Sequence, residues 1–269
     1  MADALGDRMK LLEGREAQKR SLTGLPVLIR VDGKGFSTWT RGLKYPFDER
    51  MEELRRITTK ALVLQTGALI GYHQSDEITL VLYSSDPKSE LYCDGRYQKL
   101  VSHTASLATA VWNENVPRVL PEKDGQKWAL FDSRAWEVPS LEEAANALIW
   151  REQDASKNSV SMAARSVCSH KEIHGKNSSE MQELMFQRGI NWDQYPVWAK
   201  RGTYTGRKTL GRKFTTEELE KLPPKHDARK NPDLVFERTS IEVLEMPIFS
   251  TVTNRVAVLR GAQPEGYRD

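Results

Sequence analysis

The sequence is poor in cysteine and histidine and has no long apolar segment, and each shortage excludes a class of protein. Cys93 and Cys168 are the only cysteines in 269 residues; their spacing fits no metal site, and without an export signal they indicate free thiols in a reducing cytoplasm. His170 and His174 are spaced i,i+4, but Glu172 does not follow the first histidine directly, as a zinc-protease helix requires, and no third ligand is evident. No apolar run approaches the roughly 20 residues of a membrane helix, so we expect no membrane partner.

Composition adds little on its own, whereas the distribution of charge is informative. The net charge is +3 and charged residues make up 29% of the chain, which is ordinary for a globular protein. Residues 200–230, however, contain four acidic residues and ten basic ones: Lys200, Arg201, Arg207, Lys208, Arg212, Lys213, Lys221, Lys225, Arg229 and Lys230. Such a cluster suits a polyanion such as RNA, and a solvated surface without a partner is the alternative.

Two acidic motifs follow apolar runs in the first third of the chain. The run 25–31 predicts a buried strand that ends at Asp32. Asp48 is a suitable N-cap for a helix over 49–66, which Gly67 would end. The β-rich runs 68–72 and 78–83 predict a hairpin with Asp76 at its tip. We therefore expect Asp32 and Asp76 to meet at one edge of a sheet.

The later segments complete a β-α-β-β-α-β order. We expect a helix over 96–112, a strand over 128–138 and a helix from 141 to about 151 with Ser140 as its cap. This order predicts an α+β, ferredoxin-like split βαβ fold, the layout of many polymerase palms. We predict a palm-like catalytic domain over 1–167 and a helical, basic C-terminal region over 168–269 that packs on it. Further helices are expected over 154–167 and 178–187, a loop-rich basic segment after them, and strands over 239–243 and 252–259.

Carboxylates at one sheet edge are what a magnesium-dependent nucleotidyl-transfer site needs. Asp32 and Asp76 would supply the carboxylates, and Gly33 leaves its main-chain carbonyl approachable. Glu77 either supports a second ion or points away, because neighbours on a strand face opposite sides. The alternative is that these residues only close a turn and a hairpin.

Basic residues near these motifs are candidates for binding nucleotide phosphates. Arg96 and Lys99 are spaced i,i+3 at the start of a predicted helix, where the helix dipole also favours anions. Lys34 and Lys44 lie in and just after the first motif, and Ser75 precedes the acid of the second. An exposed helix surface is the alternative for the first pair.

Seven segments together resemble the tRNA-histidine guanylyltransferase family, whose members add nucleotides in the 3′→5′ direction. They occur in the family's order and cover about residues 6–202: RVDGKGF at 30–36, KYPFDER at 44–50, GYHQSDE at 71–77, GRYQKL at 95–100, FDSR at 131–134, WREQD at 150–154, and GINW at 189–192 leading to KRG at 200–202.

The resemblance implies a palm with two magnesium ions bound by Asp32, the Gly33 carbonyl and Asp76, with Glu77 beside them. It assigns the nucleotide triphosphate to Arg96 and Lys99. It also implies that ATP adenylylates the 5′ end of a tRNA, after which the 3′-hydroxyl of an incoming GTP attacks and AMP leaves. Family members are typically tetrameric with the tRNA spanning subunits, so a homotetramer is expected.

One departure from the family bears on the choice of tRNA. Eukaryotic members carry His-Ile-Asn-Asn, associated with recognition of histidine tRNA, where this chain has SKNS at 156–159 and only Asn158 stays in register. The departure resembles the bacterial and archaeal like-protein branch, which repairs truncated tRNA 5′ ends opposite a template. We therefore expect templated repair rather than strict G addition to histidine tRNA. A palm-type nucleotide cyclase and a non-catalytic RNA-binding module remain as other classes.

Overall fold

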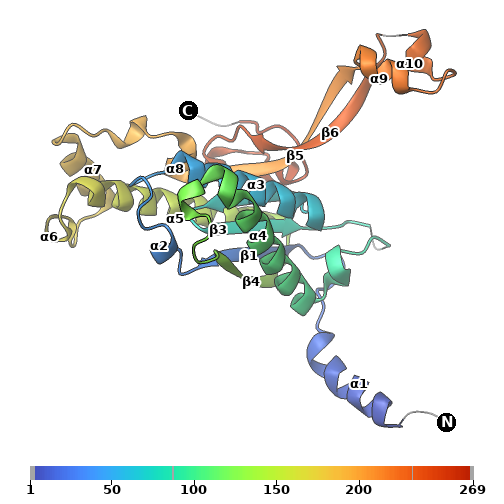
Figure 1. Cartoon of the computed structure of the whole chain (residues 1–269), viewed down its shortest axis with the longest axis horizontal. Coiled ribbons are helices and arrows are strands. Elements are labelled where there is room, and N and C mark those ends of the chain that lie inside the picture. The colour runs from blue at the N-terminus through green and yellow to red at the C-terminus, as the bar shows by residue number, and fades with distance from the viewer. Residues whose placement is uncertain (1–3, 87, 232, 267–269) are drawn as a thin grey trace.

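A six-stranded antiparallel sheet, ordered β4-β1-β3-β2-β5-β6, forms the centre of the molecule (Figure 1). The computed structural model describes residues 4–86, 88–231 and 233–266. The strands are β1 (Val27–Lys34), β2 (Ile70–Gln74), β3 (Glu77–Leu82), β4 (Leu130–Glu137), β5 (Thr203–Lys213) and β6 (Val235–Leu244). The order β4-β1-β3-β2 of the first four strands confirms the predicted split βαβ layout.

Helices α3 (Glu49–Thr66) and α4 (Tyr97–Val119) cover one face of this sheet (Figure 1). Asp48 caps α3 by accepting a hydrogen bond from the Arg50 amide, and Gly67 ends the helix with φ 68°. The fully buried Trp112 of α4 packs with strand residues such as Ile29 and with Leu54 of α3 in one apolar cluster. The predicted bounds of α3 are confirmed, whereas α4 extends seven residues beyond the predicted end at residue 112.

A single long helix, α5 (Leu141–Val167), lies on the other face with α11 (Arg255–Leu259) beside it. The fully buried Leu148 belongs to a second apolar cluster with Phe249 and Tyr72. The prediction of two helices, over 141–151 and 154–167, is wrong. The helix continues because residues 151–154 contain no glycine or proline and two of them, Arg151 and Glu152, have buried partners.

The C-terminal third differs most from the expectation. Residues 203–213, predicted as loop, form β5, which pairs with β2 and then with β6 over ten register positions. Residues 252–259, predicted as a strand, contain α11, because Val258 and Leu259 pack against the α5 side of the core. Beyond the body of the sheet, β5 and β6 continue as an arm (residues 207–231 and 233–241) that projects from the molecule (Figure 1). The C-terminal region thus adds β5 and β6 to the same sheet. The predicted boundary between two domains at residue 167 stays a prediction.

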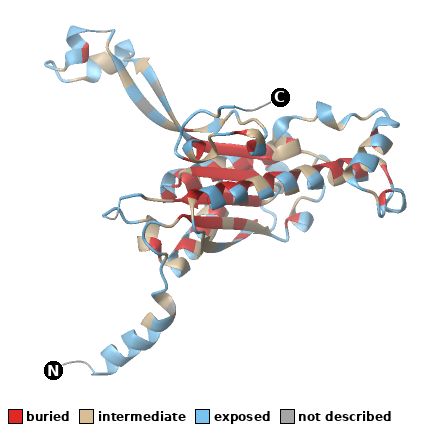
Figure 2. Ribbon diagram, turned by 180° about the vertical axis from the view of Figure 1, so that it is seen from behind, coloured by how far each residue is buried: buried red, intermediate tan, exposed pale blue. Residues whose placement is uncertain are grey.

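The remaining elements are short or peripheral. Figure 2 shows burial concentrated in the sheet, whereas the N-terminal helix and the arm are mostly exposed. These elements are α1 (Ala4–Ala17), α2 (Phe36–Trp39), η1 (Tyr92–Gly95), η2 (Pro121–Lys123), α6 (His170–Ile173), α7 (Ser178–Phe186), η3 (Trp192–Gln194), α8 (Val197–Arg201), α9 (Thr216–Lys221), α10 (Asp227–Lys230) and η4 (Phe249–Thr251). Both cysteines are free. Within the described ranges, no helix has the length and apolar character needed to span a membrane.

Candidate active site

A cavity of about 900 Å³ opens at the edge of the sheet where β1 ends. Its walls come from four parts of the chain: the end of β1 with the loop and helix start that follow (32–55), the β2–β3 turn (74–77), the middle of α5 (155–165) and the region around α8 (198–202). Asp32 and Asp76, 44 residues apart in sequence, both line it.

Pairing between β1 and the β2–β3 hairpin brings the two acids together. The Gly33 amide donates a hydrogen bond to the Asp76 carbonyl over 3.0 Å, and Asp32 lies directly opposite Glu77 in the antiparallel register. The turn itself is tight, since β2 ends at Gln74 and β3 begins at Glu77, and Ser75 takes the left-handed conformation with φ 50°. The two acidic motifs therefore meet at one edge of the sheet, as predicted.

Asp32 has cationic neighbours but an incompletely satisfied carboxylate. Arg134 Nη2 lies 2.9 Å and Arg30 Nε 3.5 Å from Asp32 Oδ2, and Asp132 is 4.0 Å from the same Arg134 nitrogen. Neither ion pair has hydrogen-bond geometry, so within the described structure the buried atoms Arg30 Nε and Asp32 Oδ2 have no hydrogen-bond partner. A buried acceptor of this kind is costly unless something else binds it.

Asp76 is also in an environment that disfavours an isolated negative charge. Burial raises the pKa of Asp76 above its usual value, and the nearby Asp32 adds to the rise. A hydrogen bond from Ser75 and the positive charge of Arg55 act in the opposite direction. A cation between the two carboxylates would relieve both the repulsion and the unsatisfied oxygen.

This donor set fits magnesium. The described residues include no group of three or more histidine, cysteine, aspartate or glutamate side chains arranged as a metal site. Magnesium is usually held by only one or two carboxylates and completes its octahedral shell with water and phosphate oxygens. Asp32, Asp76 and the main-chain carbonyl of Gly33 would be sufficient protein ligands for such an ion.

Glu77 is bound in a way that the sequence did not reveal. Arg151 of α5 holds both of its carboxylate oxygens, with Nε–Oε1 and Nη2–Oε2 distances of 2.7 Å. The same guanidinium contacts Asp154 at 3.1 Å and lies 4.6 Å from the ring of Trp150. Glu77 is on the same face of the sheet as Asp32, yet its carboxylate is occupied by Arg151. Its predicted catalytic role stays a prediction, and its observed role is to tie the start of β3 to α5.

The predicted phosphate-binding residues separate into two groups. Lys44 and Ser75 line the cavity, whereas Lys34, the exposed last residue of β1, does not. Arg96 and Lys99 lie at the start of α4, and Arg96 pairs with Asp94 at 2.8 Å and forms an isolated bridge with Arg20, which precedes β1. Arg96 and Lys99 therefore lie near the start of β1, whereas Asp32 lies near its end. Their nucleotide-binding role stays a prediction.

The predicted RNA-binding residues are similarly dispersed. Asn158 lines the cavity and donates a hydrogen bond to Asp154 over 3.0 Å. Lys200 and Arg201 end α8, and Lys200 Nζ lies 5.2 Å from the ring of Trp192 and donates to the Asp193 carbonyl. Arg207 and Lys208 are on β5 where the arm begins.

Sequence reasoning missed three arginines that line the cavity: Arg41, Arg55 and Arg165. For Arg55 a signal was present, because it directly follows Leu54 on the apolar side of a helix whose periodicity was otherwise clear. A charged residue at such a position needs a buried partner. Arg41 and Arg165 carried no comparable signal.

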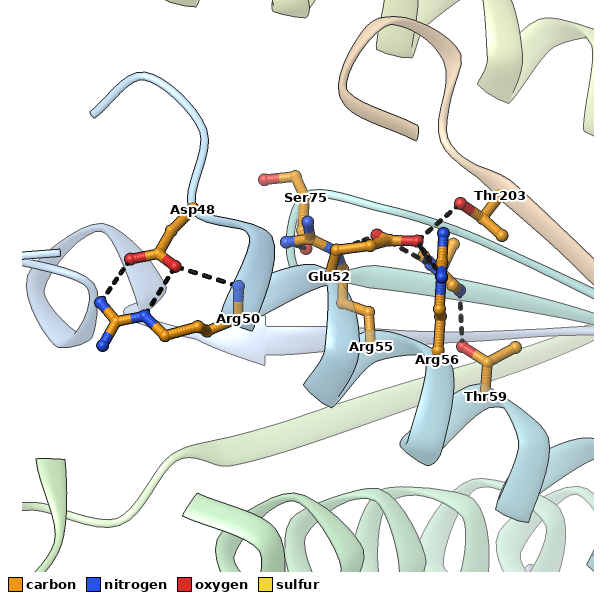
Figure 3. Close-up of polar contacts among 9 residues, drawn as sticks. Asp48, Arg50, Glu52, Arg55, Arg56, Thr59, Ser75 and Thr203 are labelled. Carbon is orange, nitrogen blue, oxygen red and sulfur yellow. Dashed lines mark hydrogen bonds and ion pairs between the residues drawn. The ribbon is translucent and has the colours of Figure 1, made fainter. Parts of the chain in front are cut away.

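Behind the turn, Glu52 is the centre of a buried polar network, drawn in Figure 3. Burial acts to raise the pKa of Glu52, but the neighbouring His73, with Arg55 and a hydrogen bond from Thr203, holds it well below its usual range. Burial lowers the pKa of His73. Glu52 is therefore charged at physiological pH.

Comparison with known proteins agrees with this site. The family model of the tRNAHis guanylyltransferase Thg1 matches residues 6–139. A bacterial tRNA(His) guanylyltransferase-like protein in complex with ATP is 34% identical, with a TM-score of 0.76 over 96% of this chain and 98% of the other. The chain belongs to the tRNAHis guanylyltransferase family. It is thus a nucleotidyltransferase with a polymerase-type palm.

Two further relatives extend the comparison to GTP and to eukaryotes. A structure of a bacterial like-protein in complex with GTP shares 32% identity, with a TM-score of 0.71 over 96% of this chain and 98% of the other. The tRNA(His) guanylyltransferase of Schizosaccharomyces pombe is 27% identical over 267 residues, which span 88% of this chain and 98% of that enzyme.

Replacing Arg151 by methionine should destabilise the protein by about 3–5 kcal/mol, because Glu77 would remain buried without its partner. Combining Arg151→Met with Glu77→Gln should recover part of this loss. The measurement is the free energy of unfolding in urea.

The matched control is Arg118→Met, which breaks an exposed ion pair with Glu53 and should change the unfolding free energy by less than about 1 kcal/mol. Equal effects of the two single substitutions would contradict a supporting role for Arg151.

Proposed function

We propose that this chain is a 3′→5′ nucleotidyltransferase that adds nucleotides to the 5′ end of tRNA, with ATP and GTP as substrates. The observation that carries the proposal is the meeting of Asp32 and Asp76 in a cavity large enough for a nucleotide. Similarity to like-proteins that bind ATP and GTP supports the choice of substrates.

The proposed reaction has two phosphoryl-transfer steps. A 5′-monophosphate end of the RNA first attacks the α-phosphorus of ATP, and pyrophosphate leaves. The 3′-hydroxyl of an incoming GTP, or of the nucleotide that a template selects, then attacks the activated 5′-phosphate and AMP leaves. Two magnesium ions, held by Asp32, the Gly33 carbonyl and Asp76, would neutralise phosphate charge and activate the attacking hydroxyl when bound.

The chain's own residues would position the reactants and balance their charge. Lys44, Arg41 and Arg165 line the cavity and are placed to attract phosphates, which would concentrate the nucleotide in the site. The carboxylate of Asp48, by contrast, is bound by Arg50. This contact lowers the pKa of Asp48, and the positive charge of Arg50 balances the negative charge of the carboxylate. Glu77 is likewise bound by Arg151, which leaves Asp76, with Asp32 beside it, as the acids placed to bind a cation.

Repair of truncated 5′ ends is the function we favour over strict G addition to histidine tRNA. The family motif associated with histidine tRNA is replaced here by SKNS at 156–159. Asn158, the residue kept in register, lines the cavity and would contact the RNA end. The likeness to bacterial like-proteins also supports this choice.

The basic segment that begins at Lys200 would bind the body of the tRNA. Within the arm, Arg212 and Lys213 form ion pairs with Glu218 and Asp233, but no ion pair to Arg207 or Lys208 is present in the described structure. These two residues, with Lys200 and Arg201, would contact phosphates of the RNA backbone. We further propose a homotetramer in the cytoplasm, on the basis of the family resemblance and the two free cysteines.

The double change Arg207→Ala and Lys208→Ala should weaken tRNA binding and reduce the slope of log affinity against log salt by about 1–2, because two phosphate contacts are lost. Filter binding of tRNA at several salt concentrations measures both quantities. Lys171→Ala with Lys176→Ala, outside the basic segment, is the control for net charge alone. An unchanged affinity and slope in the first variant would remove the arm base from the RNA-binding surface.

Transfer of labelled GTP separates the candidate substrates. We expect incorporation into a 5′-truncated tRNA, in an amount set by the opposite base, and little into intact histidine tRNA, in both cases with magnesium. With a 5′-monophosphate end the reaction should also require ATP. Addition of one G to histidine tRNA alone would show that the identity of this tRNA is read by other residues. No transfer to either RNA would contradict the proposed function.

A further inference from the structure

Arg55 of α3 lies directly behind the turn that carries Asp76. Its side chain is buried, with 9% of the residue exposed, and its Nη1 donates a hydrogen bond to the Ser75 carbonyl over 3.1 Å. Ser75 is in the left-handed region with φ 50°, which is unfavourable for a residue other than glycine or asparagine. A contact from outside the hairpin therefore helps to hold this conformation.

The charge of Arg55 is compensated on the side away from the turn. Its Nε donates to Glu52 Oε2 over 3.2 Å, and its guanidinium lies 5.8 Å from the ring of Trp198 (Figure 3 shows the contact with Glu52). Because the Glu52 contact fixes the plane of the guanidinium, a second nitrogen can point at the Ser75 carbonyl.

Glu52 does not depend on Arg55 for its own charge balance. Arg56 Nε donates to Glu52 Oε1 over 2.9 Å, and the Thr203 hydroxyl donates to the same oxygen over 2.8 Å. His73 Nε2 lies 3.2 Å from both carboxylate oxygens. Among the partners of Glu52, Arg55 is distinguished by its contact with the active-site turn.

We propose that Arg55 is a positioning residue, which holds the Ser75–Asp76 turn so that the Asp76 carboxylate and Asp32 together bind the metal ion. This role rests on the proposed function, because it assumes a divalent cation at these two acids. The competing explanation is that Arg55 is only a buried counterion of Glu52 and stabilises the fold.

Three variants distinguish these explanations. Arg55→Met removes the contact with the turn and one partner of Glu52. Arg56→Met removes a partner of Glu52 at a similar distance but no contact with the turn, and is the matched control. Arg55→Lys keeps a positive charge near Glu52, but its single nitrogen lacks the planar fork that contacts Glu52 and Ser75 together.

The test is binding of Mn²⁺ alone to the full-length protein without nucleotide or RNA, measured by electron paramagnetic resonance of free Mn²⁺. Asp76→Asn provides the reference for a damaged site, and circular dichroism shows which variants are folded. Arg55→Met should weaken Mn²⁺ binding by about tenfold or more, as is usual when the residue that orients a metal ligand is lost. Arg55→Lys should also bind more weakly than wild type, and Arg56→Met should stay within about twofold of it.

In the nucleotide-transfer assay, Arg55→Met should raise the magnesium concentration that gives half the maximal rate by about the same factor as its loss of Mn²⁺ affinity. The rate at saturating magnesium should fall much less, since the ligands themselves are intact. Loss of fold stability without loss of metal affinity would not produce this pattern.

Equal Mn²⁺ affinity in folded Arg55→Met and Arg56→Met would overturn the positioning role and leave the proposed function in place. If Arg55→Met does not fold, wild-type affinity in folded Arg55→Lys would overturn it instead. If the wild-type protein binds Mn²⁺ no better than Asp76→Asn, the metal assignment fails, and the positioning role fails with it.

Discussion

The hydrogen bond from the Gly33 amide to the Asp76 carbonyl is the contact on which the site depends. It joins the end of β1 to the β2–β3 turn and makes one cavity edge from two distant motifs. The antiparallel register that places Asp32 opposite Glu77 follows from apolar side chains packed on both faces of the sheet. A shift of one residue would move Asp32 to the opposite face. Packing of the core therefore determines whether the acids can meet.

The other charged groups around this contact are arranged in compensated pairs. Glu77 is held by Arg151, Asp48 by Arg50, and Glu52 by several donors. Buried charges are tolerated when their hydrogen bonds are complete. The acidic pair at the cavity is less complete. Asp32 Oδ2 is ion-paired with Arg134 at 2.9 Å but accepts no hydrogen bond within the described structure, and burial raises the pKa of Asp76. The charges and burial around Asp32 and Asp76 thus favour a bound cation. The ion pairs around them hold the surrounding elements in place.

Local signals predicted the first four strands and α3, because caps, turns and apolar runs lie within a few residues of one another. The cap Asp48 and the stop Gly67 gave the bounds of α3 correctly. The strand β5 was missed because its outer half is rich in basic residues and its stability comes from pairing with β6, 22 or more residues later. The segment of α11 was misread because tertiary packing overrode its β-branched residues. For the site, the acids were predictable, whereas contacts such as Arg151 with Glu77 depend on folding over 74 residues.

The most direct test of the account compares nucleotide transfer with tRNA binding in the Asp76→Ala variant. If Asp76 is a metal ligand, transfer should fall by more than about a hundredfold, because the ion that stabilises the reacting phosphates is lost. tRNA affinity should change by less than about twofold, since the proposed phosphate contacts lie on the basic segment. Transfer at the wild-type rate in a folded Asp76→Ala protein would contradict the central claim.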